Sequence, residues 1–196
     1  MNKTYISEFI GSFFLVATVI GSGIMGVNMS NGNDGVALLG NTIATGAILF
    51  VLIKMFGPIS GAHFNPAVSM VFFLRKELDF KKLLFYIAYQ MLGGIVAVIF
   101  IHYIFEIAIF QISSNIRGEI PLLVSEIIAT TGLILTILFV RKNDENSVAI
   151  AVALFITAGY WFTSSTSFAN PMVTVSRMFT DTFTGISPIS APYFLF

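Results

Sequence analysis

Two asparagine–proline pairs, Asn65-Pro66 and Asn170-Pro171, stand in apolar surroundings in the two halves of the chain. Asparagine is a strong helix N-cap and proline is preset for the first helical position, so each pair predicts a loop that turns into a helix. In lipid, irregular backbone and a free helix N-terminus are tolerated only where they are buried in protein or line a watery cavity. Two such caps therefore predict a cavity.

The side chains of these caps suggest what the cavity does. An asparagine amide offers one acceptor oxygen and two N–H donors, so its oxygen can cap the half-helix while its NH2 group faces the lumen. Two helix N-termini add partial positive charge at the same point, which disfavours cations and orients a passing water toward both amides. Protons then lack a continuous chain of hydrogen-bonded waters along which they could be transferred. One pair alone would be read as an ordinary N-cap; two copies favour the pore.

The sequence Gly61-Ala62-His63-Phe64-Asn65-Pro66-Ala67-Val68, with Asn170-Pro171-Met172 in the second half, resembles the aquaporin and aquaglyceroporin (major intrinsic protein) family. The second motif departs from the usual Asn-Pro-Ala by ending in Met172. The resemblance implies an all-α membrane protein, an inverted repeat of spans with two re-entrant half-helices. It also implies a homotetramer that conducts small neutral solutes passively, without cofactor or covalent chemistry.

Composition points to the same class of protein. The 196 residues are 56% hydrophobic and 10% charged, with apolar runs of about twenty residues, as in a polytopic membrane protein. The net charge is formally zero and gives no hint of a nucleic-acid partner. Cysteine is absent, which excludes thiol catalysis and thiolate metal sites. We find no nucleophile triad, phosphate loop or metal-ligand spacing, so we expect neither an enzyme nor a metal site.

The elements that must position the two pairs are apolar spans and two half-helices. We expect spans at residues 5–27, 36–56, 80–109, 121–140 and 147–162, and half-helices at 66–74 and 171–181 that are too short to cross a bilayer. All seven of the following basic residues fall on one side of this layout: Lys3, Arg75, Lys76, Lys81, Lys82, Arg141 and Lys142. The positive-inside rule makes that side cytoplasmic, with the N-terminus there and the chain in the cell (inner) membrane.

An internal repeat relates the two halves. Ser7-Glu8-Phe9-Ile10 matches Ser125-Glu126-Ile127-Ile128, and the two Asn-Pro motifs match each other. Three spans separate the copies, so the second copy is upside down and the half-helices point at each other near the midplane. We expect a single channel domain, residues 1–196, with a first repeat at 1–110 and a second at 120–196. Residues 191–196 look like the first turn of a sixth span, and we expect a fragment or a chain that lacks part of its pore wall.

Glu8 and Glu126 are carboxyl groups inside apolar spans, where ionisable groups are costly and usually functional. A proton relay is one interpretation. The resemblance implies another, in which each accepts hydrogen bonds from the backbone of a re-entrant loop, and the symmetric placement favours this support. His63, in the loop before the first cap, is interpreted as a loop histidine with satisfied hydrogen bonds rather than a metal ligand.

The family's constriction is formed by four positions that can be counted from the two asparagines, which here gives Thr45, Ala158, Ser167 and Val173. Water-selective members tend to have Phe, His, a small residue and Arg. The ring here has neither an aromatic residue nor an Arg, so we expect a wider filter that passes glycerol, urea or neutral metalloid hydroxides such as arsenous acid, as well as water. The Val-for-Arg change at Val173 resembles bacterial aquaglyceroporins linked to metalloids.

Arg177 lies one helical turn beyond Val173. We do not assign it the role of the filter arginine and interpret it equally well as a cap or a salt-bridge partner near Asp181. Two alternatives to the solute channel stay open: a water-selective aquaporin, and a non-conducting remnant or assembly partner.

Overall fold

The computed structural model describes residues 3–195, and the regular secondary structure in this part of the chain is helical, without strands. Its α-helices are α1 (Lys3–Met29), α2 (Asp34–Ser60), α3 (Pro66–Leu74), α4 (Phe80–Ile104), α5 (Ile120–Asn143), α6 (Val148–Phe162) and α7 (Pro171–Arg177), with short 3-10 turns at Glu145–Ser147 and Ala191–Phe194. Within the described residues, five helical segments are long and apolar enough to cross a membrane: Lys3–Met29, Asp34–Ser60, Phe80–Ile104, Ile120–Asn143 and Glu145–Phe162. The expected all-α membrane fold is confirmed.

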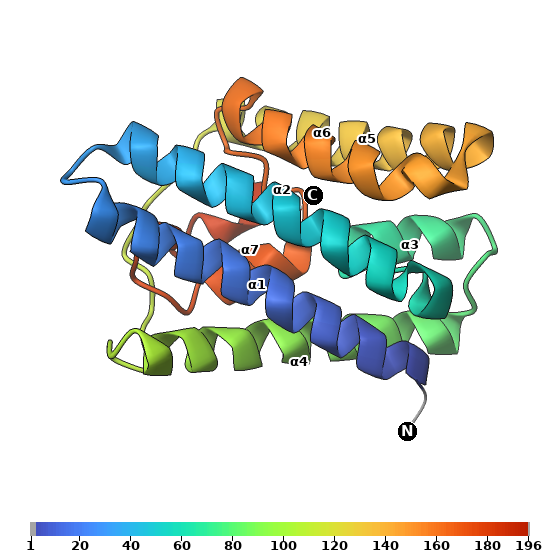
Figure 1. Cartoon of the computed structure of the whole chain (residues 1–196), viewed down its shortest axis with the longest axis horizontal. Helices are drawn as coiled ribbons and strands as arrows, with labels where there is room; N and C mark the ends of the chain where they lie inside the picture. Colours follow the sequence, from blue (N-terminus) through green and yellow to red (C-terminus); the bar gives the residue numbers. More distant parts are fainter. Residues whose placement is uncertain (1–2, 196) are drawn as a thin grey trace.

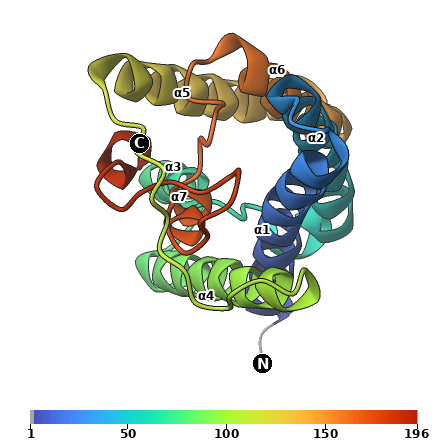
Figure 2. The same ribbon diagram turned by 90° about the vertical axis from the view of Figure 1, so that its left-hand side faces the viewer.

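The long helices surround the two short ones. Seen along the bundle, α5, α6, α2, α1 and α4 form an arc around α3 and α7 (Figure 2). Helix α1 packs against α2 and α4, α2 packs against α6, and α7 rests on α4. The N-terminus, the turn after α3 and the α5–α6 connection share one end of the bundle (Figure 1), which is the end that carries the seven basic residues.

Two helices end earlier than the sequence led us to expect. Helix α4 stops at Ile104 rather than at residue 109, because Glu106 adopts a left-handed φ of 54° and His102 Nδ1 lies 2.8 Å from the Ile109 carbonyl, which folds the chain back. Helix α7 stops at Arg177 rather than at residue 181. The Arg177 carbonyl is taken by the Ile186 amide at 3.1 Å, so another segment of the chain satisfies the helix end.

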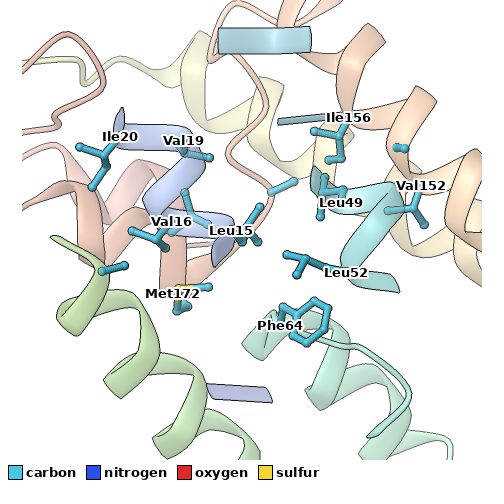
Figure 3. Close-up of a cluster of buried hydrophobic side chains, with 14 of the residues drawn as sticks. Leu15, Val16, Val19, Ile20, Leu49, Leu52, Phe64, Val152, Ile156 and Met172 are labelled. Atoms are coloured by element: carbon cyan, nitrogen blue, oxygen red, sulfur yellow. The ribbon is translucent and has the colours of Figure 1, made fainter. Parts of the chain in front are cut away.

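Small residues let the helices approach closely. A Cβ on Gly93 of α4 would collide with the Phe9 carbonyl oxygen of α1, and one on Gly46 of α2 would collide with Thr157 of α6. Apolar side chains fill the space between the helices, and Figure 3 shows Leu15 of α1, Leu49 of α2 and Ile156 of α6 in this core. Glycine contact of this kind substitutes for the hydrophobic drive that lipid cannot supply.

Met172, the residue that departs from the usual motif, belongs to the same core. It is fully buried, and Figure 3 shows it beside α4. Its Sδ would lie 2.7 Å from a Cβ placed on Gly94. The larger side chain is therefore accommodated by a glycine on the neighbouring helix, on the side of α7 that faces away from the cavity described below.

Candidate pore site

The two half-helices meet end to end through their asparagines. Asn65 Oδ1 accepts the Ala67 amide at 2.9 Å and Asn170 Oδ1 accepts the Met172 amide at 3.0 Å, so each oxygen caps its own helix. Each Nδ2 then donates across the repeat boundary, from Asn65 to the Ala169 carbonyl at 2.7 Å and from Asn170 to the Phe64 carbonyl at 2.9 Å. Pro66 and Pro171 begin the two helices.

The loops before the caps are held in an uncommon backbone conformation. Ala62, Phe64, Ser167 and Ala169 all have φ between 45° and 51°, the left-handed region. Each such residue costs of order 1–3 kcal/mol and persists only where its surroundings impose it. The pattern is the same in both repeats, because the strained residues stand one and three positions before each asparagine.

Two buried carboxylates impose that conformation. Glu8 accepts the amides of His63 at 3.1 Å and Phe64 at 2.7 Å. Glu126 accepts the amides of Phe168 at 2.9 Å and Ala169 at 2.8 Å. The N–H groups of both loops therefore point to the glutamates, and the Phe64 and Ala169 carbonyls accept from the two asparagines.

Glu8 has further partners in the first repeat. Ser60 Oγ donates to it at 2.6 Å and Gln90 Nε2 donates at 2.8 Å. His63 Nδ1 lies 3.0 Å from Ser69 Oγ, and its ring packs against Phe72 with centroids 4.6 Å apart. These are the contacts of a loop histidine with a hydrogen-bond partner, and among the described residues no group of three or more His, Asp or Glu is placed to hold a metal.

A cavity of about 90 Å³ runs past both asparagines. A single water needs about 10–15 Å³ by this measure, so several waters fit. The long helices line it with every fourth residue, which places these residues on one helix face: Thr45, Leu49 and Ile53 of α2, and Val148, Val152, Ile156 and Tyr160 of α6. The half-helices contribute Asn65, Val68 and Phe72, and Asn170, Val173 and Arg177.

Three of the four expected filter residues line this cavity, and the fourth does not. Thr45, Ser167 and Val173 are buried in its wall. Ala158 is exposed on the outside of α6, so its assignment to the ring is corrected. Tyr160 lines the cavity instead, because two residues along a helix are about 200° apart. Its hydroxyl lies 3.2 Å from Thr45 Oγ1.

Arg177 also lines the cavity, which counting from the motif did not predict. Its side chain is buried, Nε donates to the Thr184 carbonyl, and its guanidinium carbon lies 3.5 Å from the centroid of the Phe168 ring. The suggested salt bridge to Asp181 is absent among the ion pairs of the described residues. Asp181 instead accepts hydrogen bonds from the Ser114 amide and hydroxyl, which lower the pKa of its carboxyl group.

Known proteins resemble this chain in sequence and in fold. Residues 1–156 match the sequence profile of the family described as Major intrinsic protein. Aquaglyceroporin AqpS of Rhizobium meliloti is 44% identical over 195 residues, which cover 100% of this chain and 83% of that protein. A probable aquaporin TIP-type of Medicago truncatula is 35% identical over 164 residues, 81% of this chain and 64% of the relative. The X-ray structure of the aquaglyceroporin from Plasmodium falciparum aligns with a TM-score of 0.73 at 24% identity, over 89% of this chain and 78% of that one, a likeness of fold.

Proposed function

The chain belongs to the major intrinsic protein family of passive membrane channels, and we propose that it conducts glycerol, urea, neutral metalloid hydroxides such as arsenous acid, and water down their gradients. We place it in the cell (inner) membrane as a homotetramer with its N-terminus in the cytoplasm. The basic end of the bundle supports this orientation by the positive-inside rule.

The crossed asparagines are the observation that carries the proposal. Each amide uses its oxygen for its own helix and one N–H for the opposite loop. An amide has a second N–H, and both asparagines line the cavity, so this donor is available to a passing hydroxyl or water oxygen. A water or hydroxyl oxygen that accepts from both amides must point its own hydrogens away from them, which interrupts the hydrogen-bonded chain that protons would follow. The amide donors also offer no ligand to a cation.

The solute class follows from the mixture of groups in the wall. Apolar side chains from α1, α2, α5 and α6 share the wall of the cavity with the two asparagines and the residues of both loops. A small polyol offers a carbon face to the first and hydroxyl groups to the second. The 44% identical relative is itself named an aquaglyceroporin, which supports the same class. Tyr160 and Arg177 add an aromatic ring and a cation to the wall of the cavity, which favours a second candidate, a water-selective channel.

Stopped-flow light scattering on proteoliposomes tests the proposal. We expect both water and glycerol to equilibrate faster than in empty liposomes. Val68→Trp should abolish both fluxes because Val68 lines the cavity beside the asparagines, whereas Met70→Trp, on the exposed face of the same half-helix, should keep them. Water flux without glycerol flux would select the second candidate, and neither flux above empty liposomes would refute conduction.

A further inference from the structure

The two ends of the cavity are chemically unlike, although the repeat makes them structurally equivalent. Phe72 of α3 and Arg177 of α7 each stand seven residues after the asparagine of their repeat, and both line the wall. On α2 and α6 the end positions of the lining stripes are occupied by Ile53 and Tyr160. At these equivalent positions the first repeat places apolar side chains, with the His63 ring packed on Phe72, whereas the second places a cation and a phenol.

The position of Arg177 makes its charge expensive. Helix α7 begins at Pro171, which we place near the midplane of the bilayer, and its seven residues advance about 10 Å at 1.5 Å per residue. Half of a hydrocarbon region about 30 Å thick is about 15 Å, so Arg177 stays within it. An arginine at this depth normally faces a bundle interior or a water-filled path. Only 5% of Arg177 is exposed, and the cavity that it adjoins is the one that both asparagines line.

The guanidinium keeps donors free for a solute. It carries five N–H groups, and the hydrogen bond found for it in the described part of the chain uses one, from Nε to the Thr184 carbonyl. That bond and the stacking on Phe168 fix the plane of the group. Glu126 is the nearby carboxylate in electrostatic terms, but its oxygens are engaged by the Phe168 and Ala169 amides.

A second observation points to the same place. Ser167 lines the cavity, but its Oγ is fully buried beside Gly159 of α6 and has no hydrogen-bond partner among the described residues. An orphaned buried hydroxyl costs about 1–3 kcal/mol unless something else satisfies it. Rotation of this side chain toward the cavity would bring the hydroxyl to a solute hydroxyl or a water, which supplies that partner.

We infer that the selective constriction of this channel lies one helical turn beyond Val173 and consists of Arg177 and Tyr160, with Thr45 and Ser167 completing it. Arg177 donates to hydroxyl oxygens of a neutral solute, and its fixed charge rejects cations and protons. This inference rests on the proposed channel function, and it restores to the pore the cation and the aromatic ring that Val173 and Ala158 do not provide.

A purely structural role for Arg177 is the competing explanation, since its bond to Thr184 also fastens the segment that follows α7. Arg117 shows what such a role looks like. It donates to the Ser164 and Ser165 carbonyls and lies 5.7 Å from the Phe168 ring, but it is not part of the cavity wall. The two explanations for Arg177 therefore differ in whether its side chain contacts solutes in the cavity, and this is what the experiment must test.

The absence of cysteine from the sequence allows a direct test, because any introduced thiol is unique. Arg177→Cys in proteoliposomes should raise the proton leak about tenfold, since it removes a charge from a low-dielectric path. Treatment with 2-aminoethyl methanethiosulfonate replaces the positive charge and should restore the barrier, whereas methyl methanethiosulfonate, which adds no charge, should not. Ala158→Cys, on the outward face of the membrane-spanning helix α6, should react with neither reagent, because the reactive thiolate does not form in lipid, and should leave every flux unchanged.

Tyr160→Cys keeps the inference testable if Arg177→Cys does not fold. Its modification should block both water and glycerol, because the added group fills the constriction. An unchanged leak in Arg177→Cys, equal rescue by both reagents, or a Tyr160→Cys channel insensitive to modification would each overturn the inference. Loss of wild-type glycerol flux alone would contradict the proposed solute class, while thiol labelling, water flux and proton leak would still decide the position of the constriction.

Discussion

Replacing each buried glutamate by glutamine separates loop support from proton relay. Glu126 receives two backbone amides, from Phe168 and Ala169, one on each oxygen. Glutamine substitutes an NH2 group for one oxygen, so one of these amides faces another donor and loses its partner. A buried unsatisfied N–H costs about 1–3 kcal/mol, and we expect Glu126→Gln to lower the free energy of unfolding by about that amount.

Glu8→Gln should be the more damaging change. Its carboxylate also accepts from Ser60 and Gln90, so four donors converge on two oxygens, and a neutral amide weakens the bonds that remain. At about 2–4 °C per kcal/mol for a chain of this size, the Tm of Glu126→Gln should fall by roughly 2–12 °C, and that of Glu8→Gln by more.

Thermal unfolding in detergent, followed by circular dichroism, measures these shifts. Glu119→Gln is the matched control, because Glu119 precedes the same helix as Glu126, is exposed, and makes no side-chain cap hydrogen bond. It should change the free energy of unfolding by less than about 0.5 kcal/mol. An unchanged Tm in both buried variants, together with an altered pH profile of solute flux, would refute loop support and favour the relay.

Three further changes test other parts of the structure. Asn170→Asp should increase cation leak through the channel, measured by potassium efflux from proteoliposomes, and an unchanged leak would place the Asn170 side chain off the path. Val173→Arg should reduce glycerol flux more than water flux in stopped-flow light scattering, and equal losses would contradict its position in the wall. Arg141 and Arg75 hold the pKa of Glu77 below its usual 4.5. Because the pKa of Glu77 is lower in the folded protein, its ion pairs stabilise the fold at pH values above about 4.5, by less than about 1 kcal/mol for exposed groups. This part of the free energy of unfolding should be lost as the pH falls below about 4.5. Glu77→Gln should lack it at every pH, as thermal unfolding measured across pH will show.

The sequence was sufficient for the fold because its signals are local and repeated. Apolar runs of spanning length, an Asn-Pro pair at each half-helix and a glutamate in each repeat all predict the same inverted arrangement. Helix ends were less predictable. Helix α7 stops where the Ile186 amide takes the Arg177 carbonyl, and the end of α4 depends on His102 holding the Ile109 carbonyl. Both contacts close loops of seven to nine residues, which helix propensity does not encode.

The sequence was least informative about which residues line the filter. Ala158 was placed by its distance from Asn170, but the residues between α6 and α7 are not helical, so sequence distance does not determine which face of α6 points inward. The repeat of every fourth residue through Val148, Val152 and Ile156 does determine it, and extends to Tyr160. A search for this stripe, rather than for a fixed offset, would have found the tyrosine.

The two repeats share the contacts that build the channel and differ in the side chains at the two ends of its cavity. The glutamate contacts, the left-handed loop residues and the crossed asparagines are duplicated, because each half-helix needs them in order to end inside a membrane. Phe72 and Arg177 occupy equivalent positions but share no such duty, so they were free to differ. Because the duplicated parts place both residues at equal distance along their half-helices, Arg177 reaches the wall of the cavity without any change in the scaffold. The inferred role of Arg177 in selectivity therefore requires only a substitution at this position.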